Sequence, residues 1–446
     1  MGDGARLAQV ADLVAARKSD PPLVVVSAMG GVTDLLVSLA DAARGKDRAS
    51  AEATLQRLGE RHRAAVDALS LGADAAQACR EAIARELMRL GDLSVGVSLL
   101  GELPPRTADS IAAAGELLSG PLLAAALEAR GVPVAYLDPR ELLATDAGFG
   151  AAQPHEARTA ERVRDRVLPR LAAGEVVVTG GFVGAAPDGS TTTLGRGGSD
   201  YSAALLGAAL HDCGVPVTAI EIWTDVDGIL TADPRVVPEA RLVPEVSYAE
   251  AAELSFFGAK VLHPATIKPA VARGIPVVVR NTFHPQVPGT VVRGDAPGKG
   301  VRALAARSGV TAIFVGSPRM LLAHGYAARV FGVFEKHRVP VDVIATSEVS
   351  ISITVDQRAP IADVVADLGQ FADVETLADL AVVSVVGQGL RTTSGIAARL
   401  FGALADVNVV LISQGASDTN LTFVVNGADA PAALRLLHRE FFGGRS

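Results

Sequence analysis

Aromatic residues, cysteines and clusters of basic charge are all scarce in this chain of 446 residues. Aromatic side chains make up 4% of it, and the two cysteines are Cys79 and Cys213. Their spacing fits no zinc motif, and two cysteines cannot form the disulfide framework of a small secreted domain. We therefore predict buried thiols in a reducing compartment.

Long hydrophobic runs are also missing. No apolar run approaches the roughly 20 residues of a membrane-spanning helix, and no signal-peptide pattern opens the chain. The formal net charge is −8 with scattered basic residues, which does not predict nucleic-acid binding. We expect a cytoplasmic globular protein without membrane or nucleic-acid partners, and its length predicts about three domains at roughly 150 residues each.

The most informative segment is glycine-rich and spans Thr191–Asp200 (TTTLGRGGSD). Its glycines let backbone N–H groups approach a ligand, and the apolar run from Tyr201 predicts a helix whose N-terminus would stabilise an anion. Arg196 adds a planar guanidinium that can grip a carboxylate or phosphate, and Ser199 or Asp200 would cap the helix. An ordinary glycine-rich loop before a capped helix is the alternative.

Two apolar runs near this segment also end in polar loops. Residues 175–182 (EVVVTGGF) and 222–228 (IWTDVDG) have the pattern of buried parallel strands that feed one cleft. A third run, 22–28, leads into the loop 29–34, which is either a second anion loop or a plain strand–turn–helix connection. The repeated alternation of strands and helices predicts an α/β fold with a mainly parallel sheet between helices.

The last third of the chain repeats a β-α-β-β-α-β order twice, which is ferredoxin-like. The second copy runs out of chain before its fourth strand, and the spare strand 301–305 lies just before the first copy. We predict that residues 301–305 complete the second copy, so that the two modules are interleaved. The expected domains are 1–298, then 308–378, and finally 299–307 combined with 379–446. The stretch 284–300 is expected to be a linker.

Four motifs resemble the aspartokinases, which are members of the amino-acid kinase family. They are GGFVG at 180–184, TTLGRGGSDYSA at 192–203, WTDVDG at 223–228 and FFGAKVLHP at 256–264. The paired C-terminal modules look like ACT domains, so the similarity covers nearly the whole chain. The resemblance implies an amino-acid kinase fold followed by two ACT domains.

The resemblance also implies an activity. ATP with Mg²⁺ would phosphorylate the side-chain carboxylate of L-aspartate to 4-phospho-L-aspartate, the first step of lysine, threonine and methionine biosynthesis. Arg196 would grip the α-carboxylate, and Glu116, in a Gly-Glu-x-x-Ser element, would bind the ammonium unless it simply faces the surface. The other substrate-binding residues implied are Thr33, Phe182, Gly197, Gly198 and Ser199.

No strong general base is needed, because the accepting carboxylate is already ionised near neutral pH. Asp200, the catalytic candidate, would orient groups of the loop, unless it only caps the helix. The nucleotide-binding residues implied by the resemblance are Thr224, Asp225, Leu230, Arg235 and Lys260. Arg235 has a simpler alternative role as a surface partner of Glu239.

The first ACT module resembles the effector pocket of lysine-inhibited aspartokinases. L-Lysine would be the allosteric inhibitor, and the ACT modules would join two chains in a homodimer. Asp342 and Glu348 would neutralise the bound cation, unless they are solvated loop carboxylates. The implied pocket consists of Met320, Gly325, Tyr326, Ala327, Val341, Asp342, Thr346, Ser347 and Glu348.

One family element is missing from the sequence. Aspartokinases begin with a strand ending in Lys-Phe-Gly-Gly-Thr-Ser-Val, and Met1 stands where the family has the valine. We expect the true start to lie upstream, and we expect the chain as written to be a weak or dead kinase. A lysine-sensing regulatory subunit is the alternative from another class, and another kinase such as a glutamate kinase fits the ACT modules less well.

Overall fold

The chain folds into two compact units in a computed structural model. The structure describes residues 2–17, 21–258, 262, 264–317, 320 and 324–444. The first unit comprises Met1–Ile222 and Ala265–Val277, and the second comprises Trp223–Pro264 and Val278–Ser446. The chain therefore crosses between the units more than once.

A parallel three-stranded sheet forms the centre of the first unit. Its order is β1 (Leu23–Val26), β3 (Val176–Gly180), β2 (Val134–Leu137). Val24 pairs with Val178, and Ala135 pairs with Val177. Every residue of β3 is buried, as expected for a valine-rich strand covered on both faces. The predicted parallel sheet is confirmed.

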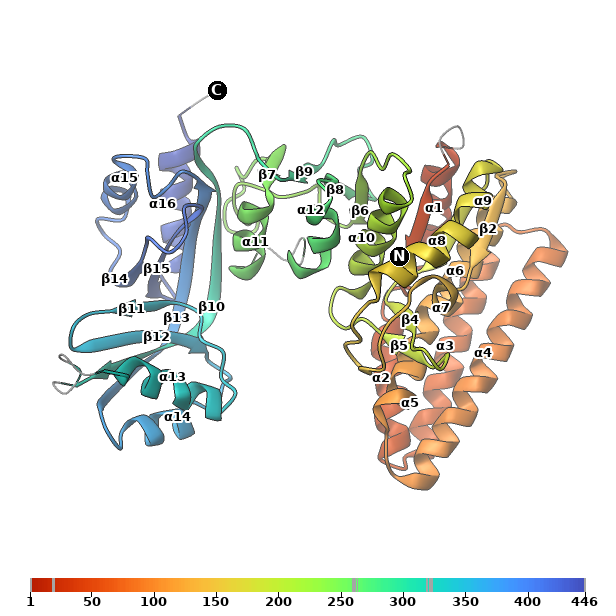
Figure 1. Ribbon diagram of the computed structural model, residues 1–446, viewed down its shortest axis with the longest axis horizontal. Helices are drawn as coiled ribbons and strands as arrows, with labels where there is room; N and C mark the ends of the chain where they lie inside the picture. Colours follow the sequence, from red (N-terminus) through yellow and green to blue (C-terminus); the bar gives the residue numbers. More distant parts are fainter. Residues whose placement is uncertain are drawn as a thin grey trace. The chain divides into compact units, whose positions relative to one another are not determined.

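Helices account for most of the first unit, and the long α3 and α4 lie side by side (Figure 1). His62 is fully buried on α3, with its Nδ1 2.7 Å from the carbonyl oxygen of Leu58. The helices are α1 (Gly4–Ala15), α2 (Val32–Arg44), α3 (Arg48–Ala68), α4 (Ala73–Leu100), α5 (Pro105–Ala112), α6 (Ala114–Glu128), α7 (Pro139–Leu142), α8 (Glu156–Arg166), α9 (Leu168–Ala172), α10 (Gly198–Asp212) and α12 (Lys268–Ala272), which follows the 3₁₀ turn η1 (Pro264–Ile267).

The helical stretch through α5 and α6 corrects one expectation from the sequence. By length and composition, the 24 residues Pro105–Glu128 could cross a membrane, although no apolar run of that kind was predicted. Within its most apolar window, 72% is buried inside the protein. Such burial is typical of a core helix, and Leu122, Leu123 and Leu127 are indeed among the fully buried side chains.

The second unit begins with a smaller sheet and one helix. Four strands lie in the order β6 (Ile220–Thr224), β8 (Val277–Asn281), β9 (Thr290–Arg293), β7 (Glu245–Ser247). Helix α11 (Tyr248–Phe256) starts with a capping box between Ser247 and Glu250. Strand β9 is a correction, because it lies in the stretch 284–300 that was expected to be linker.

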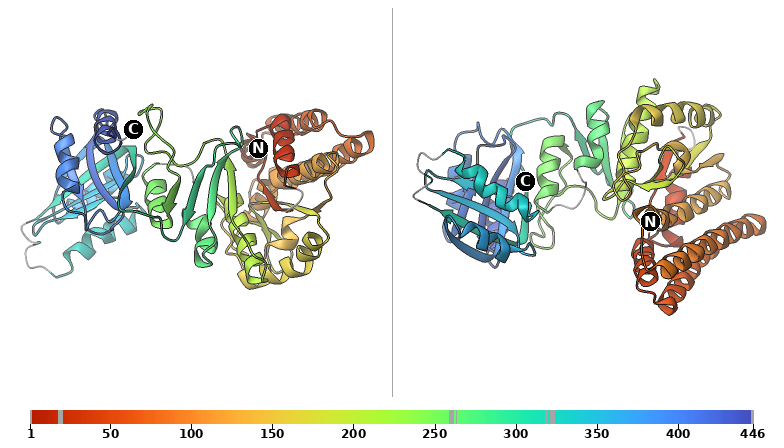
Figure 2. Two further views of the ribbon diagram at one scale, coloured as in Figure 1. Left: turned by 90° about the horizontal axis from the view of Figure 1, so that it is seen from above. Right: turned by 60° about the horizontal axis from the view of Figure 1, so that its bottom comes forward.

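The C-terminal region is one antiparallel sheet, seen from two further sides in Figure 2. The strand order is β11-β12-β10-β13-β15-β14. Its strands are β10 (Gly300–Gly316), β11 (Ile344–Thr346), β12 (Ser350–Asp356), β13 (Asp373–Gln388), β14 (Val409–Ser413) and β15 (Asn420–Asn426), and its helices are α13 (Tyr326–Lys336), α14 (Ile361–Leu368), α15 (Ile396–Ala403) and α16 (Ala430–Phe442).

Residues 301–305 complete the second ferredoxin-like copy, as predicted. Leu304 pairs with Val385 and Ala305 with Ser384, both in the first strand of that copy. The structure differs from the prediction in one respect, because the strands of the two copies are fused into the continuous β10 and β13. The register shifts near Ser308 and Val310, and Gly309 and Asp379 there have positive φ values of 76° and 56°.

Substitution of Leu304 tests whether residues 301–305 belong to the core of the second copy. This residue is 3% exposed and packs in the core of the second copy, whereas Leu377 on β13 is 43% exposed. Leu304→Ala should lower the free energy of unfolding by about 2–5 kcal/mol, because it removes buried methyl groups and leaves a cavity. Leu377→Ala should change it by less than about 0.5 kcal/mol. Calorimetry of both variants makes the comparison, and equal losses would contradict the interleaved core.

Candidate active site

Two loops of the first unit approach each other more closely than side chains would allow. A Cβ on Gly181 would lie 2.7 Å from the Cα of Ser199, and a Cβ on Gly198 would lie 2.5 Å from Cδ2 of Phe182. Glycine is therefore required at both positions. The Gly181 N–H donates to the Val26 carbonyl at 2.7 Å, so the contact forms at the carboxyl ends of β3 and β1.

Phe182 holds an uncommon backbone conformation at this contact, with φ of 62°. Its N–H donates to Ser202 Oγ at 2.8 Å, and its carbonyl accepts the Leu194 N–H at 2.9 Å. Ser202 Oγ in turn donates to the Gly198 carbonyl at 2.9 Å. Left-handed backbone is costly for a side chain such as phenylalanine, and these hydrogen bonds hold it there.

Helix α10 begins at this contact without a side-chain cap. Its N-cap is Gly197, with φ of 68°. The expectation that Ser199 or Asp200 caps the helix is wrong, because both residues already lie inside its first turn. Burial raises the pKa of the Asp200 carboxyl. The Arg196 side chain is exposed, and the described residues provide no ion pair for it.

Glu116 lies at the start of α6 and is only 6% exposed, so the surface-facing alternative is wrong. Its Oε1 accepts the Ala28 N–H at 3.1 Å, and a Cβ on Gly180 would lie 3.1 Å from the Glu116 Cβ. Burial raises the pKa of Glu116 from 4.5 to about 7, against the opposing effect of the Ala28 N–H. Because the Ala28 N–H occupies one position on this carboxyl group, its oxygens can still accept hydrogen bonds from a bound cation.

The same region includes the start of α2. Gly31 is its N-cap with φ of 74°, and Thr33 is exposed in its first turn. A Cβ on Gly115, beside Glu116, would lie 2.6 Å from the Ala28 Cβ, so the α6 start packs on the loop that leads to α2. The structure thus brings Glu116, Phe182, Gly198 and Ser199 together, and Arg196 and Thr33 flank them on exposed segments.

The predicted nucleotide residues belong to the second unit. Thr224 ends β6; its hydroxyl donates to Asp225 Oδ1 at 3.2 Å, and its carbonyl accepts the Thr282 N–H at 2.9 Å. Leu230 forms an isolated β-bridge with Leu242. Asp225 is exposed, so its carboxylate and the neighbouring hydroxyl are accessible to a ligand. Lys260 lies outside the described residues.

Arg235 has a partner other than the one expected. Its guanidinium binds Asp233 with two nitrogens, at 3.0 Å for Nε to Oδ1 and 2.7 Å for Nη2 to Oδ2. The predicted alternative of a pair with Glu239 is therefore wrong. The Arg235 side chain remains 87% exposed, and such an exposed pair contributes little to stability, so the guanidinium is available to an incoming phosphate.

The predicted effector residues gather around the first ACT module. Asp342 forms an ion pair with Arg307 of β10, and only 8% of its side chain is exposed. Tyr326 stacks edge-on against Phe371 with ring centroids 5.9 Å apart, and its hydroxyl is buried without a hydrogen-bond partner among the described residues. A buried unpaired hydroxyl is uncommon and can serve a ligand.

The remaining effector residues are more exposed. Ser347 Oγ lies 2.7 Å from Ser350 Oγ, and Glu348 is solvated. Met320 and Val341 pack against the module core, Ala327 and Thr346 are exposed, and Gly325 is the N-cap of α13 with φ of 77°. Of the two predicted cation-binding carboxylates, only Asp342 lies in a buried setting.

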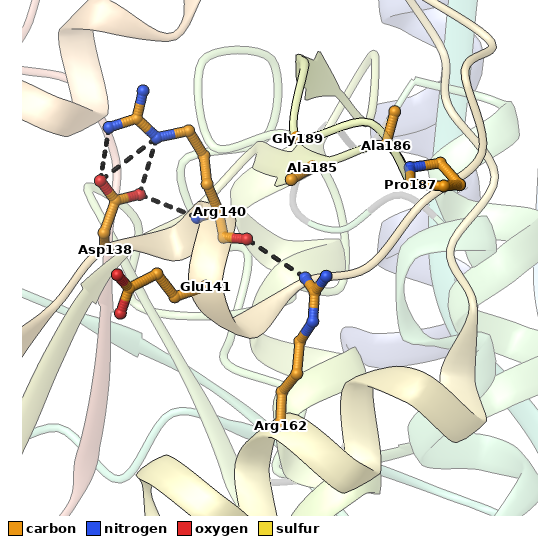
Figure 3. A pocket seen from close by; sticks show the side chains of 8 residues that line it. All are labelled: Asp138, Arg140, Glu141, Arg162, Ala185, Ala186, Pro187 and Gly189. Carbon is orange, nitrogen blue, oxygen red and sulfur yellow. Dashed lines mark hydrogen bonds and ion pairs between the residues drawn. The ribbon is translucent and has the colours of Figure 1, made fainter.

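A hollow of about 320 Å³ elsewhere in the first unit contains none of the predicted site residues (Figure 3). Its cationic side chains are already engaged. Arg140 binds Asp138 through Nη2 at 2.5 Å, and Arg162 donates to the Arg140 carbonyl at 3.1 Å. Both arginines thus already donate to acceptors within the protein.

The sequence prediction missed three residues that fix these sites. Asp109 binds backbone N–H groups of two loops, Ser202 holds Phe182, and Arg307 pairs with Asp342. Asp109 lies on α5, and the loops that it binds lie 41 and 84 residues further along the chain. Nothing local indicates the partners of Ser202 and Arg307, which lie 20 and 35 residues away.

Comparison with known proteins identifies the family. The amino acid kinase family model matches residues 1–281, and an ACT domain model matches residues 314–360 and 383–441. The lysine-sensitive aspartokinase 3 of Escherichia coli is 38% identical over 429 residues, which cover 94% of this chain and 92% of that protein. The chain belongs to the aspartokinases. Aspartokinase 1 of Arabidopsis thaliana chloroplasts is 36% identical over 98% of this chain and 78% of its own length.

Solved aspartokinase structures agree with this assignment. Escherichia coli aspartokinase III, crystallised with aspartate and ADP in the R-state, superposes with a TM-score of 0.81 and covers 99% of this chain and 97% of its own. Its T-state complex with lysine and aspartate gives the same TM-score over 98% and 96%. The amino-acid kinase fold and the ACT modules expected from the sequence are therefore confirmed.

Glu116 makes stability depend on pH. Between about pH 4.5 and 7 the unfolded chain loses the Glu116 proton while the folded chain keeps it, so the free energy of unfolding falls as pH rises. Glu116→Gln should remove this loss, so its stability relative to the wild type should increase by at most about 3 kcal/mol from pH 4.5 to 7.

Denaturant unfolding at several pH values measures this difference. Glu128→Gln is a matched control, because Glu128 is exposed on the same helix, and this variant should follow the wild type. A stability difference for Glu116→Gln that does not change with pH would contradict the assigned pKa.

Proposed function

We propose that the chain transfers the γ-phosphoryl group of ATP to the side-chain carboxylate of L-aspartate. The observation that carries this proposal is the glycine-enforced contact of residues 180–182 with residues 197–199, with the buried Glu116 at the same strand ends. The aspartate complex of the aspartokinase III of Escherichia coli supports the choice of substrate.

Charge complementarity assigns the parts of the substrate. Glu116 binds the ammonium of aspartate, because a buried carboxylate next to a cation is favoured in its ionised form. Arg196 and the N-terminus of α10 bind the α-carboxylate. Aspartate binding should therefore lower the pKa of Glu116 and release its proton near neutral pH.

Phosphoryl transfer depends on positioning and charge neutralisation more than on covalent chemistry. Thr224, Asp225, Leu230 and Arg235 would bind the nucleotide, and Lys260 would join them. The described residues contain no group of three metal-ligating side chains, so Mg²⁺ would enter as the ATP complex, held mainly by phosphate oxygens and water. Asp200 would orient groups of the loop.

Arg196→Ala tests the aspartate site. Removing a charge-assisted bidentate contact should raise the aspartate KM by about 10- to 100-fold and leave the ATP KM within about threefold. Coupled detection of ADP release at varied aspartate gives both constants. Arg166→Ala is the control, because Arg166 is half-exposed in the same unit and pairs with Glu141. An unchanged aspartate KM in Arg196→Ala would remove Arg196 from the site.

We also propose that L-lysine inhibits the enzyme through the first ACT module, within a cytoplasmic homodimer. The support is the mostly buried carboxylate of Asp342 and the buried hydroxyl of Tyr326 in this module, together with the lysine complex of the Escherichia coli relative. A lysine ammonium that reaches Asp342 must compete with Arg307. Inhibition requires lysine to bind a less active arrangement more tightly than the active one.

Asp342→Asn should raise the lysine concentration for half-inhibition by at least about tenfold, because it removes the charge that binds the ammonium. Lysine titrations of ADP release and calorimetric lysine binding measure the effect. Asp367→Asn is the control, since Asp367 pairs with Lys336 in the same module. Unchanged inhibition in Asp342→Asn would show that lysine binds elsewhere.

A further inference from the structure

Asp109 of α5 has no assigned role in the proposed chemistry, although it is only 3% exposed. Its carboxylate accepts three hydrogen bonds. Oδ2 accepts the Gly150 N–H at 3.0 Å and the Thr193 N–H at 2.9 Å, and Oδ1 accepts the Thr193 hydroxyl at 2.9 Å. These donors lie 41 and 84 residues further along the chain, so one side chain joins three separate segments.

The three donors of Asp109 are all neutral. The described residues supply no arginine or lysine to this carboxylate. A buried carboxylate without a cation is expensive unless its oxygens are satisfied by hydrogen bonds. The three hydrogen bonds of Asp109 offset this cost, and they fix two backbone positions relative to α5.

Those two positions lead directly to the aspartate-binding loop. Thr193 ends β5, and the next residue, Leu194, donates its N–H to the Phe182 carbonyl at 2.9 Å. Gly195 follows with φ of 76°, and a Cβ on it would lie 3.3 Å from the Gly150 carbonyl oxygen. Arg196 is the next residue.

A backbone hydrogen bond also joins the two segments that Asp109 binds. The Ala152 N–H donates to the Thr193 carbonyl at 2.9 Å. The loop around Gly150 is thus bound to β5 at Thr193 and lies against Gly195. Displacing Gly150 or Thr193 would displace the backbone from which Arg196 and the N-terminus of α10 emerge.

We propose that Asp109 is a positioning residue for the amino-acid substrate, holding residues 195–199 in the geometry that binds the α-carboxylate of aspartate. Asp109 acts through Thr193 and Gly150 and does not touch the substrate. The expected change in the aspartate KM rests on the proposed function. The expected change in the hydrogen exchange of the two loops does not depend on the reaction.

Asparagine at position 109 separates hydrogen bonding from charge. Its amide oxygen can take the place of Oδ2 and accept both N–H groups, and its NH₂ can donate to the Thr193 hydroxyl, which also accepts. Asp109→Asn therefore preserves all three bonds without the charge, whereas Asp109→Ala removes all three. Thr193→Val removes only the hydroxyl bond.

The experiment measures the KM values for aspartate and ATP in these three variants, and amide hydrogen exchange in peptides covering residues 146–153 and 191–199. Leu90→Ala is the control for destabilisation, because Leu90 is fully buried in a core that does not include these loops. If Asp109→Ala does not fold, Asp109→Asn and Thr193→Val still carry the test.

We expect Asp109→Ala to raise the aspartate KM by about tenfold or more, since displacements near 1 Å can cost about 100-fold, and to change the ATP KM by less than about threefold. Both peptides should exchange faster. Asp109→Asn should stay within about threefold of the wild type, and Thr193→Val should fall between the two. Leu90→Ala should lose stability while its aspartate KM stays at the wild-type value.

Three results would overturn the inference. They are an unchanged aspartate KM in folded Asp109→Ala, an Asp109→Asn variant as impaired as Asp109→Ala, and an equal rise of the aspartate KM in Leu90→Ala. A wild-type chain without aspartate-dependent turnover would instead refute the proposed function. Hydrogen exchange would then decide whether Asp109 positions the loop. The positioning role is refuted if both peptides of Asp109→Ala exchange at the wild-type rate. If Asp109→Ala does not fold, the same comparison is made with Thr193→Val.

Discussion

The contact between residues 180–182 and 197–199 is the constraint on which the substrate region depends. Two glycines create it, because a Cβ at either position would approach the opposite loop to within 3 Å. The contact places the N-terminus of α10 at the ends of β1 and β3, where Glu116 is also buried. The N-terminus of α10, with its partial positive charge, and the carboxyl group of Glu116 therefore lie at the same strand ends. This combination suits a zwitterionic amino acid.

The buried carboxyl groups of Asp109, Asp342 and Glu116 are satisfied in different ways, and the differences follow the roles assigned to them. Asp109 has three neutral donors and is complete within the fold. Asp342 has a guanidinium partner that a cationic effector can replace. Glu116 accepts the neutral Ala28 N–H, and burial raises its pKa to about 7. Glu116 is the carboxyl group that the proposed function pairs with a substrate cation.

Helix α11 packs against strands β10 and β13 of the C-terminal sheet inside the second unit. Arg302 lies 3.6 Å from Glu250, and Asn420 donates to Glu253 at 2.5 Å. Arg307, the partner of Asp342, also lies 5.6 Å from the ring centroid of Phe256 at the end of α11. The same guanidinium therefore contacts both Asp342 and the end of α11.

Much of the fold and part of the site were predictable because they follow from local sequence. The valine runs gave the parallel strands, the glycines of 195–198 gave the turn into α10, and the unfinished second ferredoxin-like copy identified 301–305 as its missing strand. The prediction of the helix cap failed because Gly197 adopts a left-handed conformation, so the helix begins before Ser199. The linker prediction failed because β9 is too short to show a clear period.

The sequence by itself therefore determined the family, the order of the elements and the segments that carry Arg196 and Glu116. Only the tertiary structure decided which residues pair in the sites: Ala28 with Glu116, Ser202 with Phe182, Asp109 with Gly150 and Thr193, and Arg307 with Asp342. The physical reason is that turn geometry and hydrophobic periodicity depend on neighbouring residues. Buried polar pairing depends instead on packing that brings together segments 20 to 88 residues apart.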